Sequence, residues 1–158
     1  MSEIVDPFCY YLRVRYPECD AQKVVFNARY GEYVDLAVTE FVRVMGLNQS
    51  GMFADFDYQL VKQTTEWRAP ARFDDVLALT VQTKHIGNTS FTLLVEFRIA
   101  GRDAVTTTVE TVYVNVDPAT LTKQPLAPRL REALEQGAAG KRVDHAGYFP
   151  SESSIHRK

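Results

Sequence analysis

Asp20 and Asn27 are the residues of this sequence whose types and spacing could do chemistry. Asp20 lies in a short turn seven residues before Asn27, and Asn27 precedes a long amphipathic segment that predicts a helix. The first amides of a helix lack intrahelical acceptors and lie at the positive end of the helix dipole. Such amides can stabilise negative charge on a carbonyl oxygen, while a carboxylate attacks the carbonyl carbon or deprotonates water. This pairing suits hydrolysis at a carbonyl group and leaves both roles of Asp20 open.

The predicted helix has one apolar stripe. From Tyr30 to Met45, apolar residues recur at i, i+3, i+4 and i+7, which is the pattern of a helix that packs on a core. Asn27 is the expected N-cap, and Gly46 fits just past the last turn. Gly31 lies inside the stripe-bearing segment. Since glycine costs about 1 kcal/mol relative to alanine in a helix, we expect a close crossing there.

The rest of the chain predicts strands with alternating apolar residues, joined by short turns. The expected strands are 10–16, 56–67, 76–86, 90–100 and 104–116, and a short helix is expected at 128–136. This order predicts an α+β hotdog fold, in which a curved antiparallel sheet wraps around one long central helix. The expected domain organisation is a lead-in over 1–9, the hotdog domain over 10–136 and a polar, irregular C-terminal tail over 137–158.

Composition narrows the class of protein. The length of 158 residues fits one domain, and the net charge of −2 argues against a nucleic-acid partner. No apolar run is long enough for a membrane span or a signal peptide, so we expect a cytoplasmic protein without a membrane partner. The 3 histidines are scattered and no metal-binding or nucleotide-binding motif occurs, so no metal is expected. No GxSxG motif occurs, which excludes the serine nucleophile of an α/β-hydrolase.

The stretch RYPECDAQKVVFNARYGEYVDLA resembles the signature of hotdog-fold acyl-CoA thioesterases of the 4-hydroxybenzoyl-CoA type. In that family an aspartate follows the first strand, apolar residues lead into the central helix, and an aromatic follows. Asp20, Val24-Val25-Phe26, Asn27 and Tyr30 match these features. The stretches EWRAPARFDDVLAL and KHIGNTSFTLLVEF extend the resemblance over 10–131. Lys23 stands where the family usually has glycine, which puts the backbone shape of the turn in doubt.

The resemblance implies an acyl-CoA thioesterase that releases a free acid and coenzyme A. Asp20 would be the nucleophile or general base, and the Asn27 amide would polarise the carbonyl. Coenzyme A enters only as part of the substrate, so no cofactor is expected. The site of such enzymes lies between two chains, which implies a homodimer or homotetramer. The residues expected to line the acyl pocket are Val25, Phe26, Tyr30 and Trp67, and those expected near the coenzyme A phosphates are Lys84, Asn88, Thr89 and Ser90.

Several alternatives compete with this prediction. A hotdog module that binds or senses acyl-CoA without hydrolysis is the main one. A hotdog dehydratase or hydratase is disfavoured because no histidine precedes His85. Glu18 is a weaker rival of Asp20, and Cys19 is a poor nucleophile because no histidine lies near it in sequence. Glu32 is expected to be a solvated or interface acid.

Overall fold

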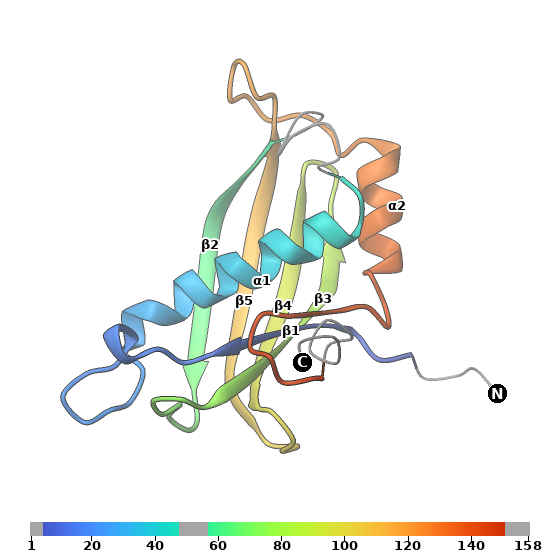
Figure 1. The fold of residues 1–158 in the computed structure, drawn as a ribbon. Helices are drawn as coiled ribbons and strands as arrows, with labels where there is room; N and C mark the ends of the chain where they lie inside the picture. The colour runs from blue at the N-terminus through green and yellow to red at the C-terminus, as the bar shows by residue number, and fades with distance from the viewer. Residues whose placement is uncertain (1–4, 48–56, 151–158) are drawn as a thin grey trace.

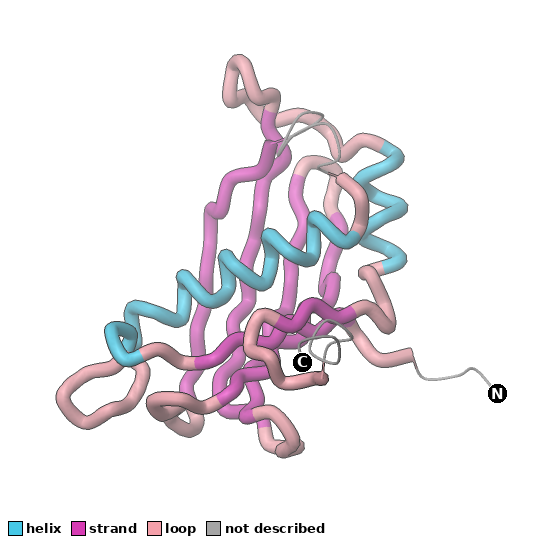
Figure 2. Tube along the Cα trace, in the orientation of Figure 1, coloured by secondary structure: helices cyan, strands magenta, loops and turns pink. Residues whose placement is uncertain are grey.

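A six-stranded sheet crossed on one face by a long helix forms the framework of the protein (Figures 1 and 2). The computed structural model describes residues 5–47 and 57–150. In chain order the elements are β1 (Phe8–Arg13), the 3₁₀ helices η1 (Tyr16–Glu18) and η2 (Asn27–Arg29), α1 (Tyr30–Val44), β2 (Asp57–Trp67), β3 (Val76–Ile86), β4 (Ser90–Ile99), β5 (Val105–Val116), α2 (Pro128–Gln136) and β6 (Arg142–Asp144). The sheet order is β2-β5-β4-β3-β1-β6.

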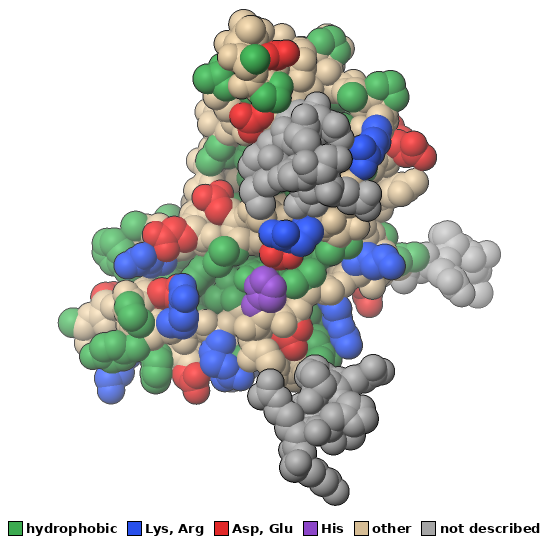
Figure 3. Space-filling view, turned by 45° about the horizontal axis from the view of Figure 1, so that its top comes forward, with side chains coloured by type: hydrophobic (Ala, Val, Ile, Leu, Met, Phe, Trp, Pro, Cys, Tyr) green, Lys and Arg blue, Asp and Glu red, His purple; other side chains and the backbone are tan. Residues whose placement is uncertain are grey.

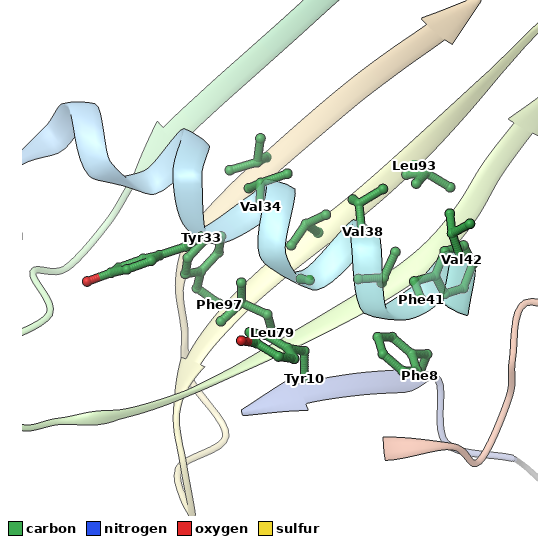
Figure 4. Packing of buried hydrophobic residues seen from close by; sticks show 14 of the residues in the cluster. Phe8, Tyr10, Tyr33, Val34, Val38, Phe41, Val42, Leu79, Leu93 and Phe97 are labelled. Carbon is green, nitrogen blue, oxygen red and sulfur yellow. The ribbon is translucent and has the colours of Figure 1, made fainter. Parts of the chain in front are cut away.

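Helix α1 packs its predicted apolar stripe on the sheet (Figure 4). Its fully buried side chains lie against buried residues of β1, β3 and β4. Those labelled in Figure 4 are Tyr33, Val34, Val38, Phe41 and Val42 of the helix, and Phe8, Tyr10, Leu79, Leu93 and Phe97 of the sheet. Burial of one such side chain typically contributes about 1.5–3 kcal/mol. This packing anchors the helix, and with it the position of its N-terminus.

The hairpin turns are those that the sequence predicts. Between β3 and β4, the Gly87 N–H donates to the Ser90 carbonyl at 2.7 Å. Between β4 and β5, Gly101 has φ of +84°, a conformation that glycine adopts without steric cost. Strand β3 is antiparallel to β1 and β4, and β5 is antiparallel to β4 and β2. The hotdog fold is therefore confirmed.

The start of α1 differs from the prediction. Asn27 is not an N-cap: it is the first residue of the 3₁₀ helix η2. Phe26 takes the extended position before this turn, and the Tyr30 N–H donates to the Asn27 carbonyl. A Cβ atom added at Gly31 would lie 3.4 Å from Gln63 Nε2, the end of a flexible side chain. A close crossing is thus not what requires glycine at this position.

Within residues 138–150, the predicted irregular tail contains one short strand, β6 (Arg142–Asp144). Strand β6 pairs with β1 in parallel, so the sheet is not purely antiparallel. Beyond β6, the Asp144 carboxylate accepts hydrogen bonds from the Ala146 and Phe149 amides at 2.9 and 2.8 Å. The Tyr148 ring stacks on Tyr11 of β1 with centroids 5.5 Å apart. This segment covers the β1 edge of the sheet.

Candidate active site

The turn that carries Asp20 is closed by backbone hydrogen bonds between β1 and α1. The Asp20 N–H donates to the Val24 carbonyl, and the Phe26 N–H donates to the Glu18 carbonyl, both at 2.9 Å. Lys23 has φ of +62° and donates its N–H to the Asp20 carbonyl at 2.9 Å. The turn therefore has the left-handed conformation at the position of Lys23, even though lysine replaces the glycine of the resembled family.

A second loop supports this turn from outside. The Val25 N–H donates to the Ala71 carbonyl at 2.8 Å, and the Phe73 N–H donates to the Lys23 carbonyl at 3.0 Å. Ala71 and Phe73 belong to the loop between β2 and β3. The turn is thus held both by its own hydrogen bonds and by a neighbouring loop, which restricts where Asp20 can lie.

The Asp20 carboxylate is exposed at the protein surface. Its Oδ1 atom accepts a hydrogen bond from the Gln22 N–H at 2.8 Å. For Oδ2, the described residues supply no hydrogen-bond partner. A nucleophile or general base needs an accessible lone pair, and Oδ2 of Asp20 offers one.

The Asn27 amide is also free to act as a donor. Asn27 is exposed at the first position of η2, directly before α1. Within residues 5–47 and 57–150, its N–H has no backbone acceptor, as expected for the first residue of a helical segment. The Asp20 carboxylate and the Asn27 amide thus lie at the two ends of one hydrogen-bonded turn.

The predicted acyl-pocket residues divide into exposed and buried sets. Phe26 and Trp67 are 55% and 47% exposed. Tyr30 is buried, with its ring 6.0 Å from that of Trp67 and 5.3 Å from that of Phe97, measured between centroids. Val25 belongs to the core. The structure therefore brings Tyr30 and Trp67 together at the start of α1, whereas Val25 faces inward.

The predicted phosphate-side residues Lys84, Asn88, Thr89 and Ser90 lie elsewhere. On β5, Thr107 is opposite Trp67 and Val114 is opposite Ser90. Seven residues at about 3.3 Å each separate these positions by roughly 23 Å. Lys84 is also paired, because its Nζ donates to Glu110 Oε2 at 2.7 Å. A single chain does not bring these residues to Asp20.

The rival residues have environments that disfavour catalysis. Glu18 is 4% exposed, and both of its carboxylate oxygens accept hydrogen bonds from Arg15, with a further one from Tyr33. Burial raises the pKa of the Cys19 thiol, as do the charges of Glu18 and Asp20, so the nucleophilic thiolate is disfavoured. The Glu32 carboxylate pairs with Arg29 on the helix surface at 3.0 Å.

A cleft of about 490 Å³ lies beside the turn, between β1, α1 and the loop that precedes β3. Its lining includes Glu18, Tyr33, Leu36 and Phe73 but not Asp20. Figure 3 shows apolar side chains gathered on the surface with charged side chains around them. Asp20 therefore faces the open surface of the single chain and not this cleft.

Within residues 5–47 and 57–150, no group of three or more His, Cys, Asp and Glu side chains could hold a metal ion. No helix in the same ranges is long and apolar enough to cross a membrane.

Comparison with known proteins decides the family. The family model described as the thioesterase-like superfamily matches residues 14–134. The chain belongs to the thioesterase-like superfamily. Both the hotdog fold and the assignment to thioester hydrolases are thereby confirmed at the level of the family.

Individual relatives agree with the family. The acyl-CoA thioester hydrolase YbgC of Escherichia coli is 28% identical over 126 residues, which cover 79% of this chain and 93% of YbgC. A solved structure from Aquifex aeolicus is 25% identical with a TM-score of 0.74, covering 81% of this chain and 99% of that one. The 1,4-dihydroxy-2-naphthoyl-CoA thioesterase Slr0204 of Synechocystis has the same fold, with a TM-score of 0.72, 20% identity, and coverage of 80% and 94%.

The hydrogen bonds around Glu18 were not predicted from the sequence. Tyr33 fits the apolar stripe of α1, and its ring is buried as that pattern predicts. Its hydroxyl nevertheless donates to Glu18 Oε1 at 2.9 Å. The sequence did offer one indication, because the hydroxyl group of a buried tyrosine usually needs a hydrogen-bond partner.

Proposed function

We propose that this protein is an acyl-CoA thioesterase in which Asp20 is the catalytic carboxylate. The observation that carries the proposal is that, among residues 5–47 and 57–150, neither Oδ2 of Asp20 nor the N–H of Asn27 at the end of the same turn has a hydrogen-bond partner. Membership in the thioesterase-like superfamily and the similarity to a protein named acyl-CoA thioester hydrolase support the reaction type.

Two routes of hydrolysis fit these groups. In the first, Asp20 attacks the thioester carbonyl, the C–S bond breaks, and water then hydrolyses the resulting anhydride. In the second, Asp20 takes a proton from water, which attacks the carbonyl directly. In both, the sulfur of coenzyme A leaves and takes up a proton. The Asn27 amide stabilises charge on the carbonyl oxygen, and one such donor is typically worth about 3 kcal/mol in the transition state.

The substrate site is proposed to lie between two copies of the chain. Asp20 is exposed, and the residues around Asn88 lie roughly 23 Å along the sheet from the start of α1. A second copy, in a homodimer or homotetramer, would bring Lys84 and the 88–90 turn to the coenzyme A phosphates of its partner's substrate. Coenzyme A is then part of the substrate and no separate cofactor is needed. A cytoplasmic location is part of the same proposal.

Aryl acyl groups, as in the 4-hydroxybenzoyl-CoA type, are the proposed substrate class. Phe26 and Trp67 are exposed, and the buried Tyr30 ring meets that of Trp67 edge-on with centroids 6.0 Å apart, so an aromatic ring of the substrate can pack against the exposed rings. A panel of aryl-CoA and straight-chain acyl-CoA thioesters tests this point. Higher kcat/KM for the aryl members supports it, and higher values for the straight-chain members contradict it.

The catalytic role is tested with Asp20→Asn. Because the carboxylate acts mainly in the transition state, kcat should fall by about 10²–10⁴-fold with little change in KM. The measurement is release of free thiol from acyl-CoA. Asp74→Asn is a matched control, because Asp74 is an exposed acid in the neighbouring loop. Binding of acyl-CoA without turnover by the unmodified protein would favour the alternative of a non-catalytic binding module.

A further inference from the structure

Glu18 is a buried carboxylate at the base of the turn that carries Asp20. Its exposed fraction is 4%, and it is the one charged residue among the buried polar residues that the structure describes. Its Oε1 atom accepts hydrogen bonds from the Arg15 N–H at 2.8 Å and from the Tyr33 hydroxyl at 2.9 Å. Its Oε2 atom accepts hydrogen bonds from Arg15 Nη2 at 2.8 Å and Nε at 3.3 Å. Four hydrogen bonds thus occupy the whole carboxylate.

These contacts make Glu18 unsuitable as a base but suitable as a fixed anchor. Burial raises the pKa of Glu18, but the hydrogen bonds and charge of Arg15 together with the Tyr33 hydroxyl outweigh it, and the pKa lies below the usual glutamate range. The carboxylate is therefore ionised at neutral pH, and its lone pairs are already used by Arg15 and Tyr33.

The backbone of Glu18 completes the connection. Its carbonyl accepts the Phe26 N–H at 2.9 Å, which closes the turn. Asp20 follows Glu18 by two residues, and Asn27 follows Phe26 by one. One residue therefore joins the end of β1, the first turns of α1 and both ends of the segment that carries the proposed catalytic groups.

We propose that Glu18 is a positioning residue, which holds Asp20 and the Asn27 amide in the geometry needed for thioester cleavage. This inference rests on the proposed function of Asp20. A buried ion pair is often no more stabilising than apolar residues of the same volume, so stability alone gives little reason for a carboxylate here. Its defined hydrogen bonds to Arg15 and Tyr33 instead specify one position of the turn relative to α1. A displacement of about 1 Å in such a site can lower the rate about 10²-fold.

The test removes one hydrogen bond to Glu18 without changing the core. Tyr33→Phe keeps the buried ring and deletes the hydroxyl that contacts Oε1. We expect kcat to fall about 10-fold to 100-fold while KM stays within about twofold. Glu18→Gln, which keeps an acceptor but loses the charge, should also lower kcat. Tyr10→Phe is the matched control, because Tyr10 is a buried tyrosine whose hydroxyl bonds to His145 Nδ1 at 2.9 Å and not to Glu18. Its kcat should remain unchanged.

Hydrogen exchange of the backbone amides gives a readout that does not depend on activity. The Asp20 and Lys23 N–H groups, both hydrogen-bonded in the turn, should exchange faster in Tyr33→Phe than in the unmodified protein or in Tyr10→Phe. Unchanged exchange and unchanged kcat in both Tyr33→Phe and Glu18→Gln would overturn the inference. So would an equal loss of kcat in Tyr10→Phe, which would show a general effect of hydroxyl deletion. Absence of turnover in the unmodified protein, with faster exchange in Tyr33→Phe, would instead contradict only the thioesterase function.

Discussion

At the scale of single residues, two acids that are two positions apart have opposite environments. Glu18 is buried, and hydrogen bonds fill its carboxylate, whereas Asp20 is exposed with one oxygen left without a partner in the described chain. In the proposed mechanism, the fixed acid positions the turn and the accessible acid takes part in the reaction. Pairs of ionisable groups whose environments differ in this way are common at catalytic sites.

Lys23 provides a prediction about the backbone of this turn. A non-glycine residue in the left-handed region costs about 1–2 kcal/mol, and glycine loses about 0.5–1 kcal/mol more entropy on folding. Lys23→Gly should therefore raise the free energy of unfolding by about 0.5 kcal/mol, as measured by urea denaturation. Gln22→Gly, at a neighbour without positive φ, should lower it by about 0.5–1 kcal/mol. A loss of stability in Lys23→Gly would contradict this account.

At the scale of elements, the periodicity of apolar residues predicts the long strands and the long helix but not the three-residue elements. Strand β4 was predictable because Phe91, Leu93, Val95 and Phe97 alternate on the buried face. Strand β6 has three residues, too few for any period, and it depends on pairing with β1. The 3₁₀ helix that begins at Asn27 was not predicted, because the same sequence is compatible with several conformations at the N-terminus of a helix.

In the candidate site too, local features were predictable from the sequence and long-range contacts were not. The spacing of Asp20 and Asn27 could be recognised because both are local to one turn. The Glu18 hydrogen bonds could not, because they join the end of β1 to Tyr33, which lies 15 residues away in a stripe that reads as purely apolar. The distance from this turn to the 88–90 hairpin also depends on how the whole sheet is assembled.

The segment after β6 has a pH-dependent anchor at Asp144. Burial raises the pKa of Asp144, but hydrogen bonds from the backbone amides, chiefly that of Phe149, outweigh it and leave the pKa below its usual range. Because the native pKa is lowered, the stabilisation is present above the unfolded pKa of about 3.9 and is lost as pH falls through the native value.

Substitution of this residue tests the anchor. At pH 7, Asp144→Asn should lower the free energy of unfolding by about 1 kcal/mol, because a charge-assisted hydrogen bond is replaced. The difference from the unmodified protein should shrink as pH falls below about 4. Urea denaturation at several pH values measures it, with Asp103→Asn in an exposed turn as the control. A difference that does not vary with pH would rule out the carboxylate charge as its source.

At the scale of the whole molecule, the two edges of the sheet differ. The β1 edge is covered by β6, whereas β2 ends the sheet on the other side within the described residues. Strand β2 has 11 residues, and most of its side chains are exposed. Among them, Leu60, Val61 and Trp67 are large and apolar. A long exposed edge strand with apolar side chains among its polar ones is a surface on which another strand can pair, which supports the proposed homo-oligomer.

Val61 is the residue that tests this pairing. It is 58% exposed and lies at the register shift between Leu60 and Lys62, so a charge there should disturb contacts between copies but not the core. The unmodified protein should have a dimer or tetramer mass by light scattering at micromolar concentration, and Val61→Lys should shift it toward the monomer. Leu121→Lys, at a loop residue that is 55% exposed, should leave the mass unchanged.

The same variant links assembly to activity. If the site needs the 84–90 region of a second copy, Val61→Lys should lose thioester hydrolysis in parallel with its loss of oligomer mass, and raising the protein concentration should restore both together by mass action. Leu121→Lys should retain both. A monomeric Val61→Lys with unchanged kcat/KM would show that one chain suffices for catalysis. The phosphate-side residues would then have to be sought near Trp67, where Arg68 donates to Thr108 Oγ1 at 2.7 Å.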